Sequence, residues 1–161
     1  MNQPIIVAAF EGWNDAGEAA TEAVRRLREA WGAVAFVDID PEEFYDFTAV
    51  RPMVQFDDDG SRRILWPENE FFFAEPAGSP AVIVLRGIEP QLRWRTFCEQ
   101  ILDVATAVNA RLIITLGALL ADVAHTRPTS VFGTAHDPKV ATALHLEASR
   151  YEGPTGVVGV L

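Results

Sequence analysis

A helical pattern framed by two short apolar runs constrains the fold of this chain more than any other feature. Residues 4–10, with the sequence PIIVAAF, form a continuous apolar run of the kind found in strands buried on both faces. Apolar residues then recur at helical spacing over residues 16–31, and Gly32 follows where a left-handed residue ends a helix. Residues 33–39 form a second strand-like run. A strand, a helix and a strand in this order predict an α/β domain with a mainly parallel sheet.

The predicted helix over residues 16–31 has one apolar face and a capping signal at its start. Asp15, with Glu18 three residues further on, has the pattern of a capping box. The apolar face consists of Ala16, Ala19, Ala20, Ala23, Val24, Leu27, Ala30 and Trp31. We therefore expect the helix to pack on the sheet through this face.

Further apolar runs extend the predicted sheet, and helical patterns that begin at Pro90 and at Asp137 separate them. The segments that we expect to share one predominantly parallel sheet are residues 5–10, 33–39, 81–86, 111–117 and 157–161. The helices between these segments should cover the two faces of the sheet, as they do in α/β sandwiches.

The middle of the chain departs from this alternation. A proline-bearing start predicts a short helix over residues 40–47. Two strand-like runs at 53–56 and 63–66 flank residues 57–60, whose Asp-Gly pair is a strong hairpin signal. We expect this hairpin and the segment at 71–73 to form an antiparallel extension of the parallel sheet.

The length of 161 residues suits one domain, and 49% apolar residues can fill its core. The predicted last strand ends without the crossover element that normally follows a parallel strand. We therefore expect residues 1–161 to be a single α/β domain that is cut at its C-terminal end.

Charge and hydropathy exclude several classes of partner. Residues 1–80 hold 16 of the 23 acidic side chains and 6 of the 13 basic ones, so they carry the whole net charge of −10. Such a surface repels phosphate backbones and anionic lipids, so we expect neither nucleic acid nor membrane as a partner. The longest apolar run, residues 112–121, is much shorter than the ~20 residues of a membrane span. With no leader-like pattern at the start, these features predict a cytoplasmic protein.

The loop between the first strand and the first helix is a candidate site. Gly12 and Gly17 have the spacing of a phosphate-binding loop, but Glu18 stands where that loop needs lysine. A dinucleotide-binding glycine triplet is also missing, so we expect no nucleotide cofactor. Two interpretations stay open for this loop: a purely structural turn, or a ligand or partner contact through Trp13, Asn14 and Asp15.

The remaining motifs give weaker indications of a functional site. The three histidines lack the spacing of a metal site, so we expect no bound metal. His125 and Arg127 follow the predicted strand at 111–117, at the edge where α/β sheets bind ligands, although a hydrogen-bonded loop histidine is the alternative interpretation. Residues 151–156 form either a tight turn or a ligand loop. The single cysteine, Cys98, lies on the apolar face of a predicted helix and excludes an internal disulfide.

Four motifs, taken in order, resemble the bacterial branch of the proteasome assembly chaperone 2 family. They are residues 10–17 (FEGWNDAG), 92–97 (LRWRTF), 116–128 (LGALLADVAHTRP) and 149–156 (SRYEGPTG). The resemblance runs over essentially the whole chain, and it implies a longer parent protein. It also implies a fold like that of purine nucleoside phosphorylases and related hydrolases, and a role analogous to that of the chaperones that guide assembly of the proteasome core. Some relatives dock through a C-terminal tail with a tyrosine, which residues 159–161 lack.

Two functions therefore compete. The first is a non-enzymatic interaction or assembly protein with a protein partner, such as proteasome subunits, and with further copies of itself in a homo-oligomer. The second is a small-molecule-binding protein or a hydrolase/phosphorylase-like enzyme. In the second, Asp15 or Glu152 would be the general base, His125 its acid/base partner and Arg127 an anion clamp. The predicted contact residues, which we expect to gather at one edge of the sheet, are Trp13, Asn14, Asp15, His125, Arg127, Tyr151, Glu152 and Thr155.

Overall fold

A computed structural model of the chain describes residues 3–146 and 151–161, which form two compact units. The first unit contains the residues up to Leu119 together with Thr155–Leu161, and the second contains Leu120–Pro154. Each unit is described by itself below.

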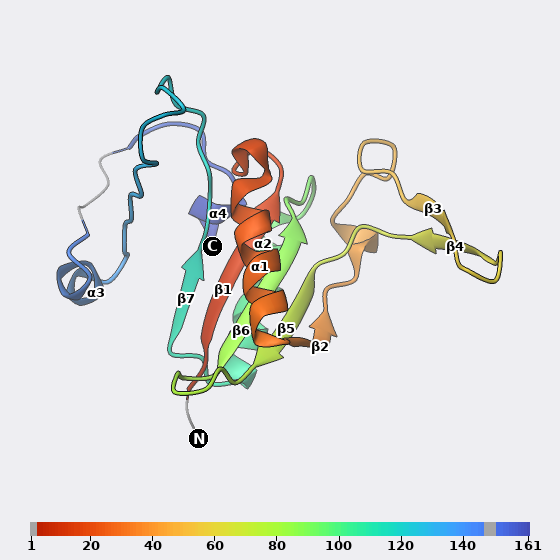
Figure 1. Ribbon diagram of the computed structural model, residues 1–161, viewed down its shortest axis with the longest axis horizontal. Coiled ribbons are helices and arrows are strands. Elements are labelled where there is room, and N and C mark those ends of the chain that lie inside the picture. Colours follow the sequence, from red (N-terminus) through yellow and green to blue (C-terminus); the bar gives the residue numbers. More distant parts are fainter. Residues whose placement is uncertain (1–2, 147–150) are drawn as a thin grey trace. The chain divides into compact units, whose positions relative to one another are not determined.

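The first unit is built on a five-stranded sheet with the strand order β2-β5-β6-β1-β7 (Figure 1). The strands are β1 (Ile5–Glu11), β2 (Val34–Asp38), β5 (Glu70–Ala74), β6 (Val82–Ile88) and β7 (Leu112–Thr115). The interior strand β1 runs parallel to both of its neighbours, β6 and β7. The strand β5 runs antiparallel to both of its neighbours, β6 and β2. The predicted mixed, mostly parallel sheet is therefore confirmed.

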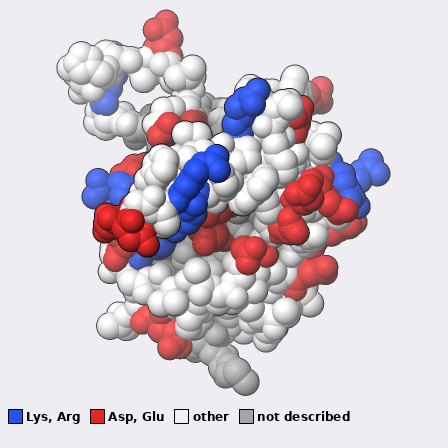
Figure 2. All heavy atoms as spheres, turned by 90° about the vertical axis from the view of Figure 1, so that its right-hand side faces the viewer, with Lys and Arg blue, Asp and Glu red and all other residues white. Residues whose placement is uncertain are grey.

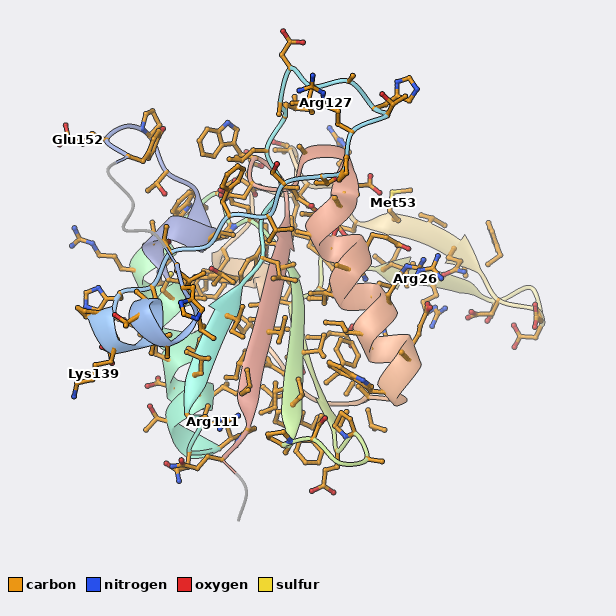
Figure 3. The ribbon with its side chains drawn as sticks, turned by 60° about the vertical axis from the view of Figure 1, so that its left-hand side comes forward. Arg26, Met53, Arg111, Arg127, Lys139 and Glu152 are labelled. Carbon is orange, nitrogen blue, oxygen red and sulfur yellow. The ribbon has the colours of Figure 1, made fainter. Side chains whose placement is uncertain are left out.

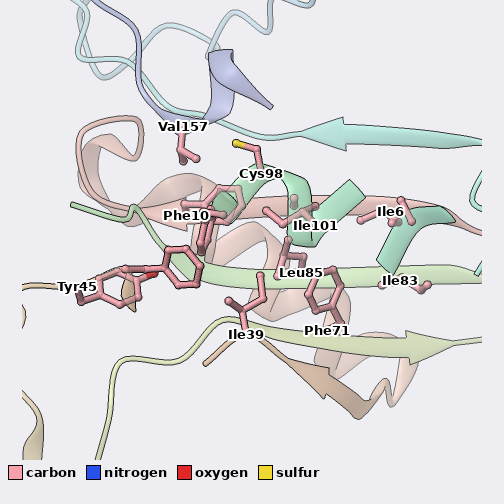
Figure 4. Close-up of a cluster of buried hydrophobic side chains, with 14 residues drawn as sticks. Ile6, Phe10, Ile39, Tyr45, Phe71, Ile83, Leu85, Cys98, Ile101 and Val157 are labelled. Atoms are coloured by element: carbon pink, nitrogen blue, oxygen red, sulfur yellow. The ribbon is translucent and has the colours of Figure 1, made fainter. Parts of the chain in front are cut away.

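Two helices cover the two faces of this sheet, because the buried strands are apolar on both sides. Helix α1 (Ala19–Trp31) packs through Ala20 and Val24 on the face that carries Ala9 of β1. Helix α2 (Trp94–Ala107) packs on the opposite face. Its cluster combines Phe97, Cys98, Ile101 and Ala105 with Ile6, Ala8, Phe10, Ile83 and Leu85 (Figure 4). The alternation of residues 6–10 between the two clusters follows the period of two residues in a strand.

The first helix has a narrower apolar face than predicted. A three-residue 3-10 turn, η1 (Ala16–Glu18), precedes α1, so the α-helix begins at Ala19. Within α1 only Ala20, Thr21 and Val24 are buried, whereas Leu27 and Trp31 pack at the margin of the cluster. Gly32 ends the helix with a left-handed φ of 57°, as predicted.

The largest correction concerns the end of the chain. Residues 157–161 are not a strand of the sheet: Val157–Val160 form the short helix α4, which packs against α2 and β1. Val157 is fully buried in the α2 cluster, and Leu161 N donates to Val157 O at 3.0 Å. Val157 is thus buried by packing against α2 and β1, without pairing in the sheet, whereas Val160 is exposed. The argument that this strand lacks its crossover therefore does not hold.

The middle of the chain contains three smaller corrections. The strands β3 (Met53–Phe56) and β4 (Arg62–Leu65) form the predicted hairpin, but it is a separate two-stranded sheet and not part of the main one. The predicted helix at 40–47 is only a 3-10 turn, η2 (Pro41–Glu43), capped by the Asp40 carboxylate at 2.9 Å from Glu42 N. Helix α2 begins at Trp94 and not at Pro90, after Arg93 with a φ of 53°.

The second unit contains one helix among its described residues, α3 (Pro138–Ala143). It begins where the sequence predicts, and the Asp137 carboxylate caps it by accepting a hydrogen bond from Lys139 N at 2.8 Å. Among the described residues of the whole chain, no helix has the length and apolar character that a membrane crossing needs.

A buried polar network lies at the end of β6. The Tyr45 hydroxyl donates to Ile88 O at 2.6 Å and accepts from Asn69 Nδ2 at 2.7 Å, and Asn69 Oδ1 accepts from Ile88 N at 3.0 Å. Asn69 is fully buried, and burial raises the pKa of the Tyr45 phenol. Gly87 lies against the Asn69 side chain, where a Cβ would overlap Oδ1. The network fixes the position at which β6 leaves the sheet.

Candidate functional site

The three parallel strands end at one edge of the sheet, which we call the carboxyl edge. In the register of the sheet, Glu11 of β1 lies beside Ile88 of β6, and Ala8 lies beside Thr115 of β7. The segments that follow these strands are residues 12–15, 89–90 and 116–118. The carboxyl ends of parallel strands are where open α/β sheets bind their ligands, so this edge is the candidate site.

Glu89 is the hub of the carboxyl edge. Its Oε1 accepts hydrogen bonds from Asn14 Nδ2 at 2.9 Å and from Val157 N at 2.8 Å, and its Oε2 lies 3.4 Å from Trp13 N. Glu89 N donates in turn to Glu11 O at 2.8 Å. One carboxylate thus joins the loop after β1 to the start of α4, although these segments lie more than 60 residues from it in the sequence.

Two glycines allow this close packing around Glu89. A Cβ on Gly156 would overlap the Asn14 amide and lie 2.5 Å from Glu89 Oε1. Gly12 has a φ of 133°, and its Cβ would lie 3.0 Å from the Cβ of Glu89. Both positions therefore need glycine because the chains approach each other closely.

Asp15 is a structural carboxylate. It is 6% exposed, and its oxygens accept hydrogen bonds from Ala20 N at 2.6 Å, from Thr21 N at 3.2 Å and from the Thr21 hydroxyl. These amides belong to the first turn of α1, so Asp15 caps the helix from outside the 3-10 turn. The predicted capping box is wrong, because Glu18 has a φ of 57° and makes no capping hydrogen bond.

Trp13 and Asn14 of this loop differ in their exposure and in their contacts. Asn14 is half-buried and donates to Glu89, and its carbonyl oxygen accepts from Ala118 N at 2.7 Å, which ties the loop to the segment after β7. The Trp13 side chain is 63% exposed. The loop therefore presents an aromatic side chain on a backbone that is held from both sides.

Most of the other predicted site residues belong to the Leu120–Pro154 unit. His125, Arg127, Tyr151 and Glu152 are all exposed there, and the Tyr151 hydroxyl donates to Pro154 O at 2.9 Å. Figure 3 shows Arg127 and Glu152 with their side chains on the loops of this unit. Thr155 lies in the first unit, at the start of the segment that Glu89 holds. The convergence of Asp15 with His125, Arg127 and Glu152 stays a prediction. Ser149 and Arg150 lie outside the described residues.

Sequence analysis missed Glu89 and the ion pair beside it. The Arg86 guanidinium lies 2.6 Å from the Glu11 carboxylate, and both side chains are half-buried on neighbouring strands. The rule that singled out residues 12–15 applies equally to Glu89, because it directly follows β6. Its position directly after a core strand is therefore the sequence signal that could have found Glu89, which belongs to no recognised motif.

Neither a cluster of metal-ligating side chains nor an exposed thiol is found among the residues that the structure describes. Among the residues that the structure describes, no three His, Cys, Asp or Glu side chains are grouped to hold a metal ion. Cys98 lies on the buried side of α2, and burial raises the pKa of its thiol. A buried thiol with a raised pKa is a poor nucleophile.

We expect Glu89→Ala to lower the free energy of unfolding by about 2 kcal/mol, because it leaves the Asn14 amide and Val157 N without an acceptor. The loss should also accelerate hydrogen exchange of the Val157 amide. Urea unfolding and amide exchange measure the two effects. The control is Glu99→Ala on the exposed side of α2, and equal effects of the two substitutions would contradict the role of Glu89 as a hub.

Fold and site together define an α/β protein in which hydrogen bonds within the chain hold together the segments at the carboxyl edge of the sheet. The sequence model of the PAC2 family matches residues 9–161, so the chain belongs to the PAC2 family. No curated protein matches the chain.

Solved structures of two bacterial proteins resemble the chain closely. A PAC2 family protein from Streptomyces avermitilis is 46% identical with a TM-score of 0.94, and the match covers 98% of this chain and 68% of that one. A proteasome-assembly chaperone homologue from Mycobacterium tuberculosis is 45% identical with a TM-score of 0.87, over 97% of this chain and 66% of that one. The chain thus spans about two thirds of the length of these relatives.

A more distant structure shares only the fold. The archaeal proteasome activator PbaB from Pyrococcus furiosus is 18% identical with a TM-score of 0.53, over 71% of this chain and 46% of that one.

Proposed function

We propose that this chain is part of a cytoplasmic, non-enzymatic protein that binds proteasome subunits and assists their assembly. The observation that carries the proposal is the state of the carboxyl edge. At this edge Asp15 and Glu89 accept hydrogen bonds from backbone amides and Glu11 pairs with Arg86, while Trp13 is exposed beside them. A general base must be able to reach a substrate proton, which a carboxylate already engaged by hydrogen bonds or an ion pair does poorly.

An exposed tryptophan on a rigid loop is, in contrast, a typical anchor of protein interfaces. Tryptophan is among the residues that dominate binding energy, because it buries a large area at a small cost in side-chain entropy. The loop backbone is held by Glu89 on one side and by Ala118 on the other. The name of the chaperone homologue, which is 45% identical to this chain, supports the choice of proteasome subunits as the partner.

The test is affinity purification of the protein, expressed at its natural length from its own cells. We expect proteasome core subunits to accompany the wild-type protein, and Trp13→Ala to reduce their recovery at least about tenfold, as loss of an interface anchor does. Leu102→Ala on the exposed side of α2 is the matched control and should leave recovery unchanged.

Two outcomes would overturn this proposal. One is a wild-type eluate without proteasome subunits, and the other is equal recovery with Trp13→Ala. The enzyme hypothesis would then gain, with Asp15, His125 and Glu152 as the residues to replace first.

A further inference from the structure

Strand β2 forms one end of the main sheet, and we call its outer side the β2 edge. Because β2 pairs only with β5, the outer row of its backbone amides and carbonyls has no strand partner among the described residues. In Figure 1, β2 is the outermost strand of the sheet, at the end opposite β7. Every residue of β2 is exposed. An edge of this kind is a template to which an extended segment of another protein can add.

The face of the β2 edge that lies on the α2 side of the sheet is apolar. Val34 lies opposite Phe73, and the two side chains are 70% and 40% exposed. Phe73 shares its face with Phe71, two residues away in β5, and Phe71 is buried in the α2 cluster. The ring of Phe36, at the β-bulge of β2, is also exposed and lies 6.4 Å from that of Phe71 between centroids. We call Val34, Phe36 and Phe73 the apolar side of the β2 edge.

The opposite face of the β2 edge, on the α1 side, is acidic. Asp38 lies directly opposite Glu70, and like charges in this position repel each other. Partial burial, and then the neighbouring Glu68, raise the pKa of Glu70. Within the described part of the chain, no basic side chain forms a salt bridge with any of these three carboxylates. The guanidinium of Arg28 on α1 stacks instead on the ring of Phe72, 4.0 Å from its centroid. A cation from outside would therefore relieve the repulsion.

A hollow of about 380 Å³ lies beside these carboxylates. It is lined by residues 35–39, Pro41 and residues 66–70, and therefore lies between β2 and the segment that leads into β5. Trp66, in its wall, is 49% exposed and offers a ring on which an ammonium or guanidinium group can stack. Figure 2 looks onto this side of the molecule, where uncharged surface lies between separate groups of acidic and basic side chains. The hollow thus suits a long basic side chain that enters from an added strand.

We propose that the β2 edge binds an extended segment of a partner protein in which apolar and basic side chains alternate. The segment adds to the sheet as a further strand beside β2. Because successive side chains of a strand point to opposite faces, its apolar residues cover the apolar side of the edge, while its lysine or arginine residues face Asp38 and Glu70. The net charge of −10 favours a basic partner. This surface lies on β2 and β5, whereas Trp13 follows β1, so the binding of the segment does not depend on proteasome binding through Trp13.

The first test titrates the capped peptide Thr-Val-Arg-Val-Arg-Val-Thr into the protein at its natural length, in a calorimeter. We expect it to bind, and the same peptide with glutamate in place of arginine to bind at least about tenfold more weakly, because like charges then meet. Asp38→Arg should weaken binding of the arginine peptide by a similar factor. Glu99→Arg makes the same charge change on the exposed side of α2 and should bind like the wild type. Circular dichroism checks that both variants are folded. A wild type that does not bind the arginine peptide, or equal binding by Asp38→Arg, would overturn the proposal.

The second test asks whether the peptide pairs through its backbone. The amides of every second residue in a strand point to the same neighbour, so N-methylation of one alternating set of peptide amides should abolish binding, and methylation of the other set should not. The peptide should also slow amide hydrogen exchange within residues 34–38. Equal binding of the two methylated peptides would contradict strand addition. So would a β2 strand whose amides are all protected before the peptide is added, because another copy or a distant segment of the natural protein would then occupy the edge.

Discussion

Replacement of Phe97 by alanine should lower the free energy of unfolding by about 3–5 kcal/mol, the range for removing a fully buried phenylalanine. Phe97 is the centre of the cluster between α2 and the sheet, with no exposed surface. Its ring packs edge-on against Phe10 of β1, at 5.8 Å between centroids, and against Phe44, at 5.3 Å. The substitution thus leaves a cavity where α2, β1 and the loop after η2 pack together.

The matched control for this prediction is Leu102→Ala, on the same helix but on its exposed side. It should cost well under 1 kcal/mol, because a surface leucine loses little packing. Urea unfolding of the two variants measures the difference. Equal destabilisation by the two substitutions would show that α2 does not bury the face that carries Phe97.

The sequence predicts best those elements whose residue pattern directly reflects how buried they are or where they end. Residues 5–10 are apolar without interruption because β1 lies inside the sheet, between β6 and β7, and has a helix on each face. The end of α1 at Gly32 follows equally from local chemistry, since only a left-handed residue fits there without strain.

Prediction fails where a distant segment decides the structure. The run from Gly156 to Leu161 has the composition of a strand, but Glu89 accepts a hydrogen bond from Val157 N and the Val157 side chain packs in the core, so the run forms α4. The run at 33–39 is apolar like a central strand, yet β2 lies at the edge and its side chains are exposed. An apolar run can be a buried strand or an exposed strand at the edge of the sheet, and its composition alone does not distinguish the two.

The same limit applies to the candidate site. The edge rule selects the loop at residues 12–15 as a candidate, because its position after the first strand is a local signal. It could not reveal that Asp15 caps α1 or that Glu89, 75 residues beyond Asn14, holds the loop. These roles depend on contacts across the fold, and a carboxylate that serves as a structural acceptor looks the same in sequence as a catalytic one.

A second large effect is expected at Gly87, in the middle of the buried network of Tyr45 and Asn69. The Cβ of an alanine at position 87 would overlap Asn69 Oδ1 and lie 3.0 Å from Phe10 Cδ1. Asn69 is fully buried and cannot move without losing its hydrogen bonds to the Tyr45 hydroxyl and to Ile88 N. We therefore expect Gly87→Ala to lower the free energy of unfolding by about 3 kcal/mol, from overpacking and from unsatisfied buried groups.

A double-mutant cycle isolates the cause of that loss. Asn69→Ala alone should cost about 2 kcal/mol, because it leaves Ile88 N without its acceptor and the Tyr45 hydroxyl without its donor. It also opens the space that the Cβ at position 87 needs, so Gly87→Ala should cost at least about 1 kcal/mol less in the Asn69→Ala background than in the wild type. Unfolding in urea of the four proteins measures this coupling. Additive effects would show that the alanine is rejected by the backbone of β6 or by Phe10, and not by Asn69.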